Sequence, residues 1–373
     1  MTLLGLIPEP PFDPSSWSGS SANFFHALQD HGILSNACEV SLSTARDTFE
    51  KIRRLSIPMR RWKERYHASV PRFRALTRAA GEIIAEHRGK SNSGILQIGA
   101  WFSSGAATAL PCFSYHDGNA ALGYRYYGRG LLSEKTRQTH LQWERSVYAA
   151  LAGIFVMSNW LADSFTQDFG VPRSKAHVVG AGINLEKLPQ VPERSWASPR
   201  FLLVGRDFER KRGRYLLQAF DTVRKSLPNA ELTIVGPTAS MARPGVSFAG
   251  YLSKSNRSDR ARLDELFSTA TAMVLPSIYE PFGISLLEGM AYGLPCITVN
   301  RCALPEIVRH GETGLVARAE DSTSLANAMI ELGGSPRDAS RMGAAGRKRV
   351  ESDYTWSAVT AKMKTVLAST YGI

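Results

Sequence analysis

Short apolar runs alternate with longer stretches of helical periodicity along the first half of the chain. The runs are rich in Ile, Leu, Val and Phe and are bounded by Pro, Gly or Ser, as buried strands are. They predict strands at 2–7, 94–99, 109–115, 153–157 and 176–179. Apolar positions at helical spacing predict helices at 22–29, 71–87, 135–152 and from a capping Ser158 to about Phe169. This alternation indicates a doubly wound α/β domain with a parallel sheet.

The second half repeats the alternation after a proline-rich segment with little periodicity. That segment, 181–200, is predicted to be an interdomain linker. Strands are expected at 201–204, 231–235, 246–248, 272–275 and 296–299, and helices at 215–225, 264–270, 284–291, 322–332, 336–351 and 357–368. The chain has 373 residues, more than one core usually supports. We therefore expect two domains, 1–180 and 201–352.

Composition narrows the class of protein. Hydrophobic residues make up 43% of the chain, an ordinary share, and no apolar run is long enough to span a membrane. The start, MTLLGLIPEPPF, has no basic region, so it predicts a strand rather than a signal peptide. The cysteines show no CxxC spacing, so we expect no disulfide, no zinc site and a reducing cytoplasm. They are Cys38, Cys112, Cys296 and Cys302.

The net charge of +12 indicates either anionic partners or a solvated basic surface. The densest basic segment extends from Lys51 to Arg65, with seven basic residues against one acid and with Leu, Ile, Met and Trp among them. This mixture suits the headgroup region of an anionic membrane, and a solvated helical surface is the alternative. No nucleic-acid motif occurs, so we expect no nucleic-acid partner.

A strand, turn and helix at residues 272–291 carry the most specific chemistry. Such a turn lies at the carboxyl end of a parallel sheet, and the backbone N–H groups from about Gly283 onward suit a diphosphate. Glu280 and Glu288 flank this helix start, and carboxylates are good acceptors for sugar hydroxyls. The combination predicts a nucleotide sugar site. The alternative is a helix cap and a solvated charge.

The same stretch resembles a known enzyme family. The pattern E-P-F-G-x-x-x-x-E-x-M-A-x-G-x-P, which runs here from Glu280 to Pro295, is a signature of retaining glycosyltransferases of family 4, which have the GT-B fold. The resemblance implies two Rossmann-like, doubly wound parallel-sheet domains that face each other across a cleft. It also implies that 353–373 forms a helix that crosses back onto the first domain, anchored by Trp356.

The resemblance assigns roles to residues of the second domain. The expected donor-binding residues there are Arg206, Lys211, Tyr251, Leu252, Glu280, Phe282, Gly283, Ile284 and Glu288. Arg206 and Lys211 match the cations that bind the diphosphate in the family, although an exposed basic loop is the alternative. Glu280 would hold sugar hydroxyls, and Glu288 would hold the ribose. Tyr251 and Leu252 follow a strand near the expected position of the base.

Fewer positions match in the first domain. His116, at the end of a predicted strand, matches a histidine that faces the donor sugar, and Asp117 would orient its ring or meet the acceptor. Gly19 would let the backbone approach the donor phosphates closely. The chain departs from the family where Arg212 stands between Lys211 and the next glycine, which puts the local backbone in question.

Together with these residues, the resemblance implies a retaining transferase that moves a sugar from a nucleoside diphosphate sugar to a saccharide or lipid-linked acceptor. The expected catalytic residues are His116, Arg206, Lys211 and Glu280. No DxD occurs, so we expect no cofactor and no essential metal. The family and the charge suggest surface polysaccharide or glycolipid synthesis in the cytoplasm, at the inner face of a membrane. The alternatives are an epimerase or a phosphorylase of the same fold, and a non-catalytic scaffold that binds nucleotide sugars.

Overall fold

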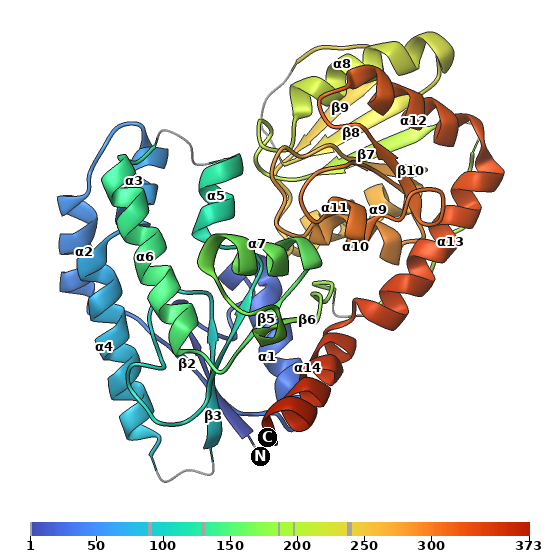
Figure 1. The fold of residues 1–373 in the computed structure, drawn as a ribbon. Coiled ribbons are helices and arrows are strands. Elements are labelled where there is room, and N and C mark those ends of the chain that lie inside the picture. Colours follow the sequence, from blue (N-terminus) through green and yellow to red (C-terminus); the bar gives the residue numbers. More distant parts are fainter. Residues whose placement is uncertain (1, 89–91, 128–130, 186, 197, 237–240) are drawn as a thin grey trace. The chain divides into compact units, whose positions relative to one another are not determined.

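The computed structural model describes residues 2–88, 92–127, 131–185, 187–196, 198–236 and 241–373 (Figure 1). These residues form two compact units. The first unit comprises Met1–Gly180 together with Trp356–Ile373, and the second comprises Ala181–Thr355. The C-terminal helix therefore folds with the N-terminal part of the chain.

In the described residues the first unit has one parallel sheet, with the strand order β2-β1-β3-β4-β5-β6. The strands are β1 (Thr2–Ile7), β2 (Leu34–Glu39), β3 (Asn92–Ile98), β4 (Cys112–His116), β5 (Gly153–Val156) and β6 (Ala176–Val178). Every residue of β4 and β5 is buried, because strands inside a parallel sheet are covered on both faces. This burial explains why β5 reads as an unbroken apolar run.

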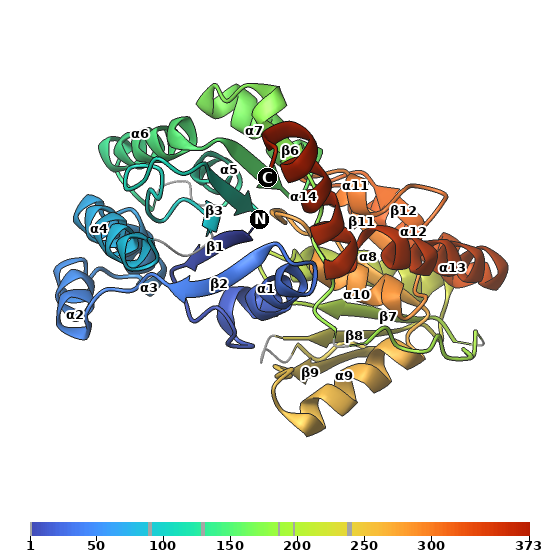
Figure 2. The same cartoon turned by 90° about the horizontal axis from the view of Figure 1, so that it is seen from below.

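Helices surround this sheet. They are α1 (Ser20–Asp30), α2 (Thr44–Arg53), α3 (Met59–His67), α4 (Val70–Glu86), α5 (Ala120–Tyr126), α6 (Glu134–Ala150), α7 (Asn159–Phe169) and α14 (Trp356–Tyr371), with 3-10 turns η1 (Ser16–Gly19) and η2 (Arg173–Lys175). Ser158 caps α7 by accepting a hydrogen bond from the Leu161 N–H at 3.1 Å. The last helix, α14, packs beside α1, with the Trp356 and Phe24 ring centroids 5.4 Å apart (Figure 2).

The second unit also has a parallel sheet in its described residues, with the order β12-β11-β10-β7-β8-β9. The strands are β7 (Arg200–Val204), β8 (Glu231–Val235), β9 (Val246–Gly250), β10 (Ala272–Leu275), β11 (Cys296–Val299) and β12 (Gly314–Ala317). The helices are α8 (Gly213–Ser226), α9 (Arg257–Thr269), α10 (Ile284–Ala291), α11 (Leu304–Ile307), α12 (Ser322–Gly334) and α13 (Pro336–Asp353). Both sheets are therefore doubly wound, as predicted.

The structure corrects several predicted elements. The strand expected at 109–115 begins only at Cys112, because Pro111 cannot donate a ladder hydrogen bond. The helix expected at 264–270 begins at Arg257, because the Asn256 side chain accepts hydrogen bonds from the Ser258 and Asp259 N–H groups and caps it. The sequence also left β2, α2, α3, α5, α11 and β12 unassigned.

The proline-rich segment at 181–200 folds with the second unit. Its Arg194 donates hydrogen bonds to the carbonyls of Phe267, Ser268 and Ala270, at the C-terminal end of α9. A guanidinium at that position satisfies carbonyls that the helix itself leaves without partners. Across the described ranges, no helix is both long and apolar enough to cross a bilayer.

Candidate functional site

In the second unit the strand order reverses between β7 and β10, since β8 and β9 lie on one side of this pair and β11 and β12 on the other. Ligands of doubly wound sheets bind outside the carboxyl ends of the strands at such a point. The loop after β7 carries Arg206, Arg210 and Lys211, and the loop after β10 carries Ser277 and Glu280. The sheet topology therefore brings two loops together that lie far apart in the sequence.

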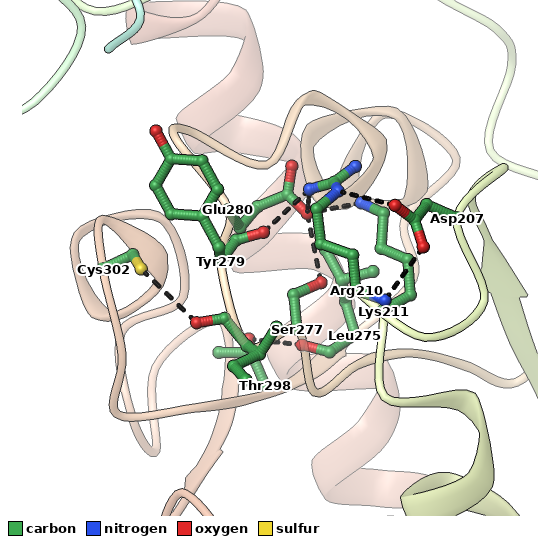
Figure 3. A network of polar contacts seen from close by, with 10 residues as sticks. Asp207, Arg210, Lys211, Leu275, Ser277, Tyr279, Glu280, Thr298 and Cys302 are labelled. Atoms are coloured by element: carbon green, nitrogen blue, oxygen red, sulfur yellow. Dashed lines mark hydrogen bonds and ion pairs between the residues drawn. The ribbon is translucent and has the colours of Figure 1, made fainter. Parts of the chain in front are cut away.

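Glu280 is the centre of the polar network at this point (Figure 3). Its Oε2 atom accepts hydrogen bonds from Lys211 Nζ, from Ser277 Oγ at 3.1 Å and from Arg210 Nη1 at 3.4 Å. Burial alone would raise the pKa of the Glu280 carboxyl, but the charges of Lys211 and Arg210 and the hydrogen bonds from Lys211 and Ser277 outweigh it, so the pKa is lowered. Glu280 is therefore a buried anion, 8% exposed, held by two cations.

Lys211 is buried to the same degree, with 5% of its surface exposed. Burial lowers the pKa of its ammonium group, and the nearby Glu280 carboxylate opposes that shift. The lysine stem lies against Gly205, where an added Cβ would stand 2.6 Å from Lys211 Cε. Only a glycine at 205 leaves room for this stem. The exposed-loop alternative is therefore wrong for Lys211.

The residue inserted after Lys211 leaves the loop intact. Arg212 adopts a left-handed conformation with φ of 56° and becomes the N-cap of α8. Gly213 then begins the helix against the Phe208 ring, where an added Cβ would lie 1.9 Å from Phe208 Cε2. The side chain of Arg212 points to an exposed ion pair with Glu320 at 3.1 Å. The insertion is thus absorbed by one unusual backbone conformation.

Arg206 and Tyr251 form a second pair of predicted site residues. Arg206 Nη2 donates a hydrogen bond to Tyr251 Oη, and the guanidinium lies over the tyrosine ring, 4.3 Å from its centroid. Tyr251 is half exposed and directly follows β9, while Leu252 beside it is partly buried. The pair gives Arg206 a fixed position on an accessible face of the second unit.

The helix α10 begins at the predicted turn. Its N-cap, Gly283, has φ of 97°, and Ile284 is its first, partly exposed residue. The first N–H groups of a helix have no partner within it and can bind an anion. Phe282 just before the turn is buried, with its ring centroid 6.0 Å from that of Tyr354, so it anchors the turn from inside.

Glu288 lies on α10 and is 3% exposed. Its Oε1 atom accepts a hydrogen bond from Lys254 Nζ, whose side chain is about half exposed. Lys254 belongs to the loop between β9 and α9. The carboxylate expected to hold a ribose is therefore already paired with a lysine that can move into solvent.

The predicted residues of the first unit are packed against their own neighbours. His116 is buried, its Nε2 lies 2.8 Å from Ser114 Oγ, and its ring stacks edge-on against Phe165 and Tyr148. Burial lowers the pKa of His116 to about 3, so the ring is neutral. This packing favours a structural role for His116, and its contact with a donor sugar stays a prediction.

Two other predicted residues lie in loops, Asp117 directly after β4 and Gly19 between β1 and α1. Asp117 Oδ2 accepts a hydrogen bond from Trp17 Nε1 at 3.3 Å, and the Gly19 carbonyl accepts one from Asn23 Nδ2 at 2.8 Å. Gly19 is the left-handed N-cap of α1, with φ of 88°. The η1 turn thus orders this loop, and the roles of Asp117 and Gly19 toward ligands stay predictions.

Sequence reasoning missed Arg210, Ser277 and Lys254. Arg210 lies beside Lys211 in a run of basic residues, and nothing in the sequence shows that it faces Glu280 as Lys211 does. It also donates a hydrogen bond to the Tyr279 carbonyl at 2.7 Å, which fixes the direction of the Arg210 side chain (Figure 3).

No cluster of three or more potential metal ligands occurs in the part of the chain that the structure describes. The metal requirement stays a prediction.

Residues 186–349 match the family model described as glycosyl transferases group 1. This stretch is therefore similar to group 1 glycosyltransferase domains. It contains Arg206, Lys211, Glu280 and Glu288, the four charged residues singled out in the second unit. The match therefore covers the side of the chain where the polar network was found.

Two curated relatives show how far the similarity extends. Glycogen synthase of Mycobacterium tuberculosis (strain ATCC 25618 / H37Rv) is 32% identical over 223 residues, which are 56% of this chain and 52% of that protein. MMP alpha-(1->4)-mannosyltransferase of Mycolicibacterium hassiacum is 29% identical over 230 residues, 60% of this chain and 55% of that protein. The chain thus spans about half the length of the curated relatives it matches.

Solved structures match the whole chain. Sucrose-phosphate synthase from Thermosynechococcus elongatus has a TM-score of 0.71 at 20% identity, and all of both chains is covered. WaaG, a glycosyltransferase involved in lipopolysaccharide biosynthesis, has a TM-score of 0.66 at 14% identity, covering 99% of this chain and 100% of that chain. At these identities the likeness concerns the fold alone. The predicted α/β class and GT-B fold are confirmed.

Proposed function

We propose that this protein is a retaining glycosyltransferase that uses a nucleoside diphosphate sugar and a saccharide or lipid-linked acceptor. The observation that carries the proposal is the buried Glu280 carboxylate, held by Lys211 and Arg210 at the switch point of the stretch that matches the group 1 glycosyltransferase model. A buried lysine and a partly exposed arginine beside a fixed carboxylate suit a substrate that joins a diphosphate to a hydroxyl-rich sugar.

The demanding step is departure of the diphosphate from the anomeric carbon. The carbon–oxygen bond breaks, its electron pair leaves with the diphosphate oxygen, and positive charge grows on the sugar. Arg206, Lys211 and the backbone N–H groups after Gly283 would stabilise the departing charge. One such preorganised donor contributes roughly 3 kcal/mol to the transition state. The acceptor hydroxyl oxygen then bonds to the anomeric carbon, and its proton passes to the departing diphosphate oxygen.

The network explains how Glu280 stays charged while Lys211 serves the diphosphate. If Lys211 Nζ turns toward a phosphate oxygen, Arg210 Nη1 and Ser277 Oγ remain within 3.4 Å of the carboxylate. A single cation could not serve both partners in a buried site, because an unpaired buried carboxylate is strongly disfavoured. Glu280 would accept hydrogen bonds from sugar hydroxyls, and Glu288 would accept them from the ribose after Lys254 moves away.

Several finer features belong to the same proposal. Retention would follow if the acceptor attacks on the face that the diphosphate leaves. The charge is supplied by Arg206, Lys211 and Arg210, so we propose that neither a cofactor nor an essential metal is needed. A lipid-linked acceptor would bring the protein to the inner face of a membrane for polysaccharide or glycolipid synthesis.

The first test is a thermal-shift panel with UDP, GDP, ADP and CMP, and with the common nucleotide sugars of each. We expect stabilisation by one nucleoside diphosphate and a larger shift with one of its sugars. An acceptor screen with that donor should then release the nucleoside diphosphate only when an acceptor is present, and chelator should leave the rate unchanged. A donor that is altered without acceptor would indicate an epimerase. Binding without turnover on any acceptor would indicate a scaffold.

A further inference from the structure

An unusual cluster of apolar side chains is exposed on the first unit. Ten large apolar residues are exposed in the part of the chain that the structure describes, and five of them fall between residues 49 and 59. Their exposed fractions are Phe49 58%, Ile52 61%, Leu55 63%, Ile57 92% and Met59 63%. They lie on α2, at the start of α3 and in the connection between them. We call residues 44–63 the α2–α3 corner.

The helix α2 packs with its polar side inward. Glu50 is 4% exposed and accepts a hydrogen bond from Ser69 Oγ at 3.0 Å, and Asp47 accepts one from Tyr66 Oη. Phe49 and Ile52 point to the opposite, solvent side. A helix on a water-exposed surface normally has the reverse orientation. Water alone therefore does not account for this arrangement, whereas contact with an apolar phase does.

The α2–α3 corner is also strongly basic. Its exposed cations are Arg46, Lys51, Arg53, Arg60, Arg61 and Lys63. Its acids, Asp47 and Glu50, are turned inward to Tyr66 and Ser69. A second copy of the same surface would bring cations against cations, which disfavours a symmetric dimer through this corner. Apolar side chains among cations suit a bilayer with anionic headgroups.

We propose that the α2–α3 corner docks on an anionic lipid bilayer, with Phe49, Ile52 and Ile57 entering the headgroup region and the surrounding cations contacting lipid phosphates. This inference goes beyond sugar transfer and does not depend on it, because lipid binding can be measured without any donor. The structure also changes the set of residues involved. Trp62, counted among the membrane-facing residues from sequence, instead donates its indole N–H to the Lys51 carbonyl at 2.8 Å.

The test is co-sedimentation of the full chain with vesicles of equal parts phosphatidylglycerol and phosphatidylcholine, and with vesicles of phosphatidylcholine alone. The wild-type protein should bind the anionic vesicles and be released by high salt. The variant Phe49→Gln/Ile52→Gln should lower the vesicle partition coefficient by about tenfold or more, because it removes two apolar side chains. Glutamine favours the helical conformation, so α2 should stay formed. Leu110→Gln, at an exposed apolar residue on another loop, is the matched control.

Charge is tested separately. Arg61→Glu/Lys63→Glu should also lower binding by about tenfold or more, whereas Lys225→Glu/Lys348→Glu changes net charge equally on the second unit and should not. Arg60 is unsuitable because it donates to the Tyr127 carbonyl at 2.6 Å. Equal binding to both vesicle types, wild-type binding by the apolar variant, or a dimer that the apolar variant abolishes would each overturn the proposal. The thermal transition of every variant should match that of the wild type, since the changed side chains are exposed.

Discussion

Replacing Lys211 with methionine tests the buried network most directly. Methionine keeps most of the stem that packs against Gly205 and removes only the ammonium group. Glu280 would retain Arg210 Nη1 at 3.4 Å and Ser277 Oγ at 3.1 Å. Breaking a buried ion pair costs about 3–5 kcal/mol when the remaining charge is left alone. Because two partners remain, we expect a loss near the lower limit, about 3 kcal/mol.

The effect on turnover should be separable from the effect on folding. Loss of one preorganised charge at the departing diphosphate removes roughly 3–4 kcal/mol of transition-state stabilisation, which lowers kcat by about a hundredfold to a thousandfold. A loss of about 3 kcal/mol in stability would lower the melting temperature by about 6–12 °C for a unit of this size. At a temperature well below the transition the variant therefore remains folded, and its kcat reports the chemistry.

The assay is release of the nucleoside diphosphate at saturating donor and acceptor, run beside a melting curve of the same sample. Lys225→Met is the matched control, because it makes the same substitution at an exposed lysine on α8. We expect the control to keep its rate and its melting temperature. A folded Lys211→Met protein that loses less than about tenfold in kcat would refute the role of Lys211 at the leaving group.

Three further outcomes follow from the structure. Glu288→Gln should weaken binding of the free nucleoside diphosphate by about tenfold or more, measured by calorimetry against Glu312→Gln, an exposed control. Burial raises the pKa of Glu144 to about 7 from 4.5, so its contribution to stability is lost as pH rises from about 4.5 through 7. Glu144→Gln should therefore be more stable than wild type by about 3 kcal/mol at pH 8 and equal to it near pH 4, by urea unfolding. Gly283→Ala should abolish the nucleotide-induced thermal shift while the chain stays folded, because φ of 97° strains any residue with a Cβ; an unchanged shift would exclude the α10 start as the anion site.

The sequence predicted the features that depend on residues close together in the chain. The strand Ala272–Leu275 and the helix Ile284–Ala291 have the bounds that the sequence indicated, because an apolar run, a Pro/Gly turn and a helical period are all encoded within about twenty residues. Ser158 was recognised as a cap for the same reason, since its partner is three residues away. The GT-B fold followed from the order of such elements together with the family signature.

The family resemblance placed Lys211 and Glu280 at one donor site, but local reasoning could not predict that they contact each other. The contact of both Arg210 and Lys211 with Glu280 depends on the parallel pairing of β7 with β10, which places two loops from distant parts of the chain at one sheet edge. The pairing of Lys254 with Glu288 likewise joins the loop before α9 to α10 across 34 residues of sequence, and an isolated polar loop gives no sign of it.

The sequence by itself determined the strands, the turns and the residue types at the candidate donor site, because these depend on neighbours along the chain. The tertiary structure decided which charges are buried and paired, and it turned the acidic side of α2 inward through Glu50 and Ser69. A buried charge requires a partner, and here the fold brings that partner from a distant part of the sequence. Periodicity locates a helix, but only the hydrogen bonds and charges packed against it determine which face remains exposed.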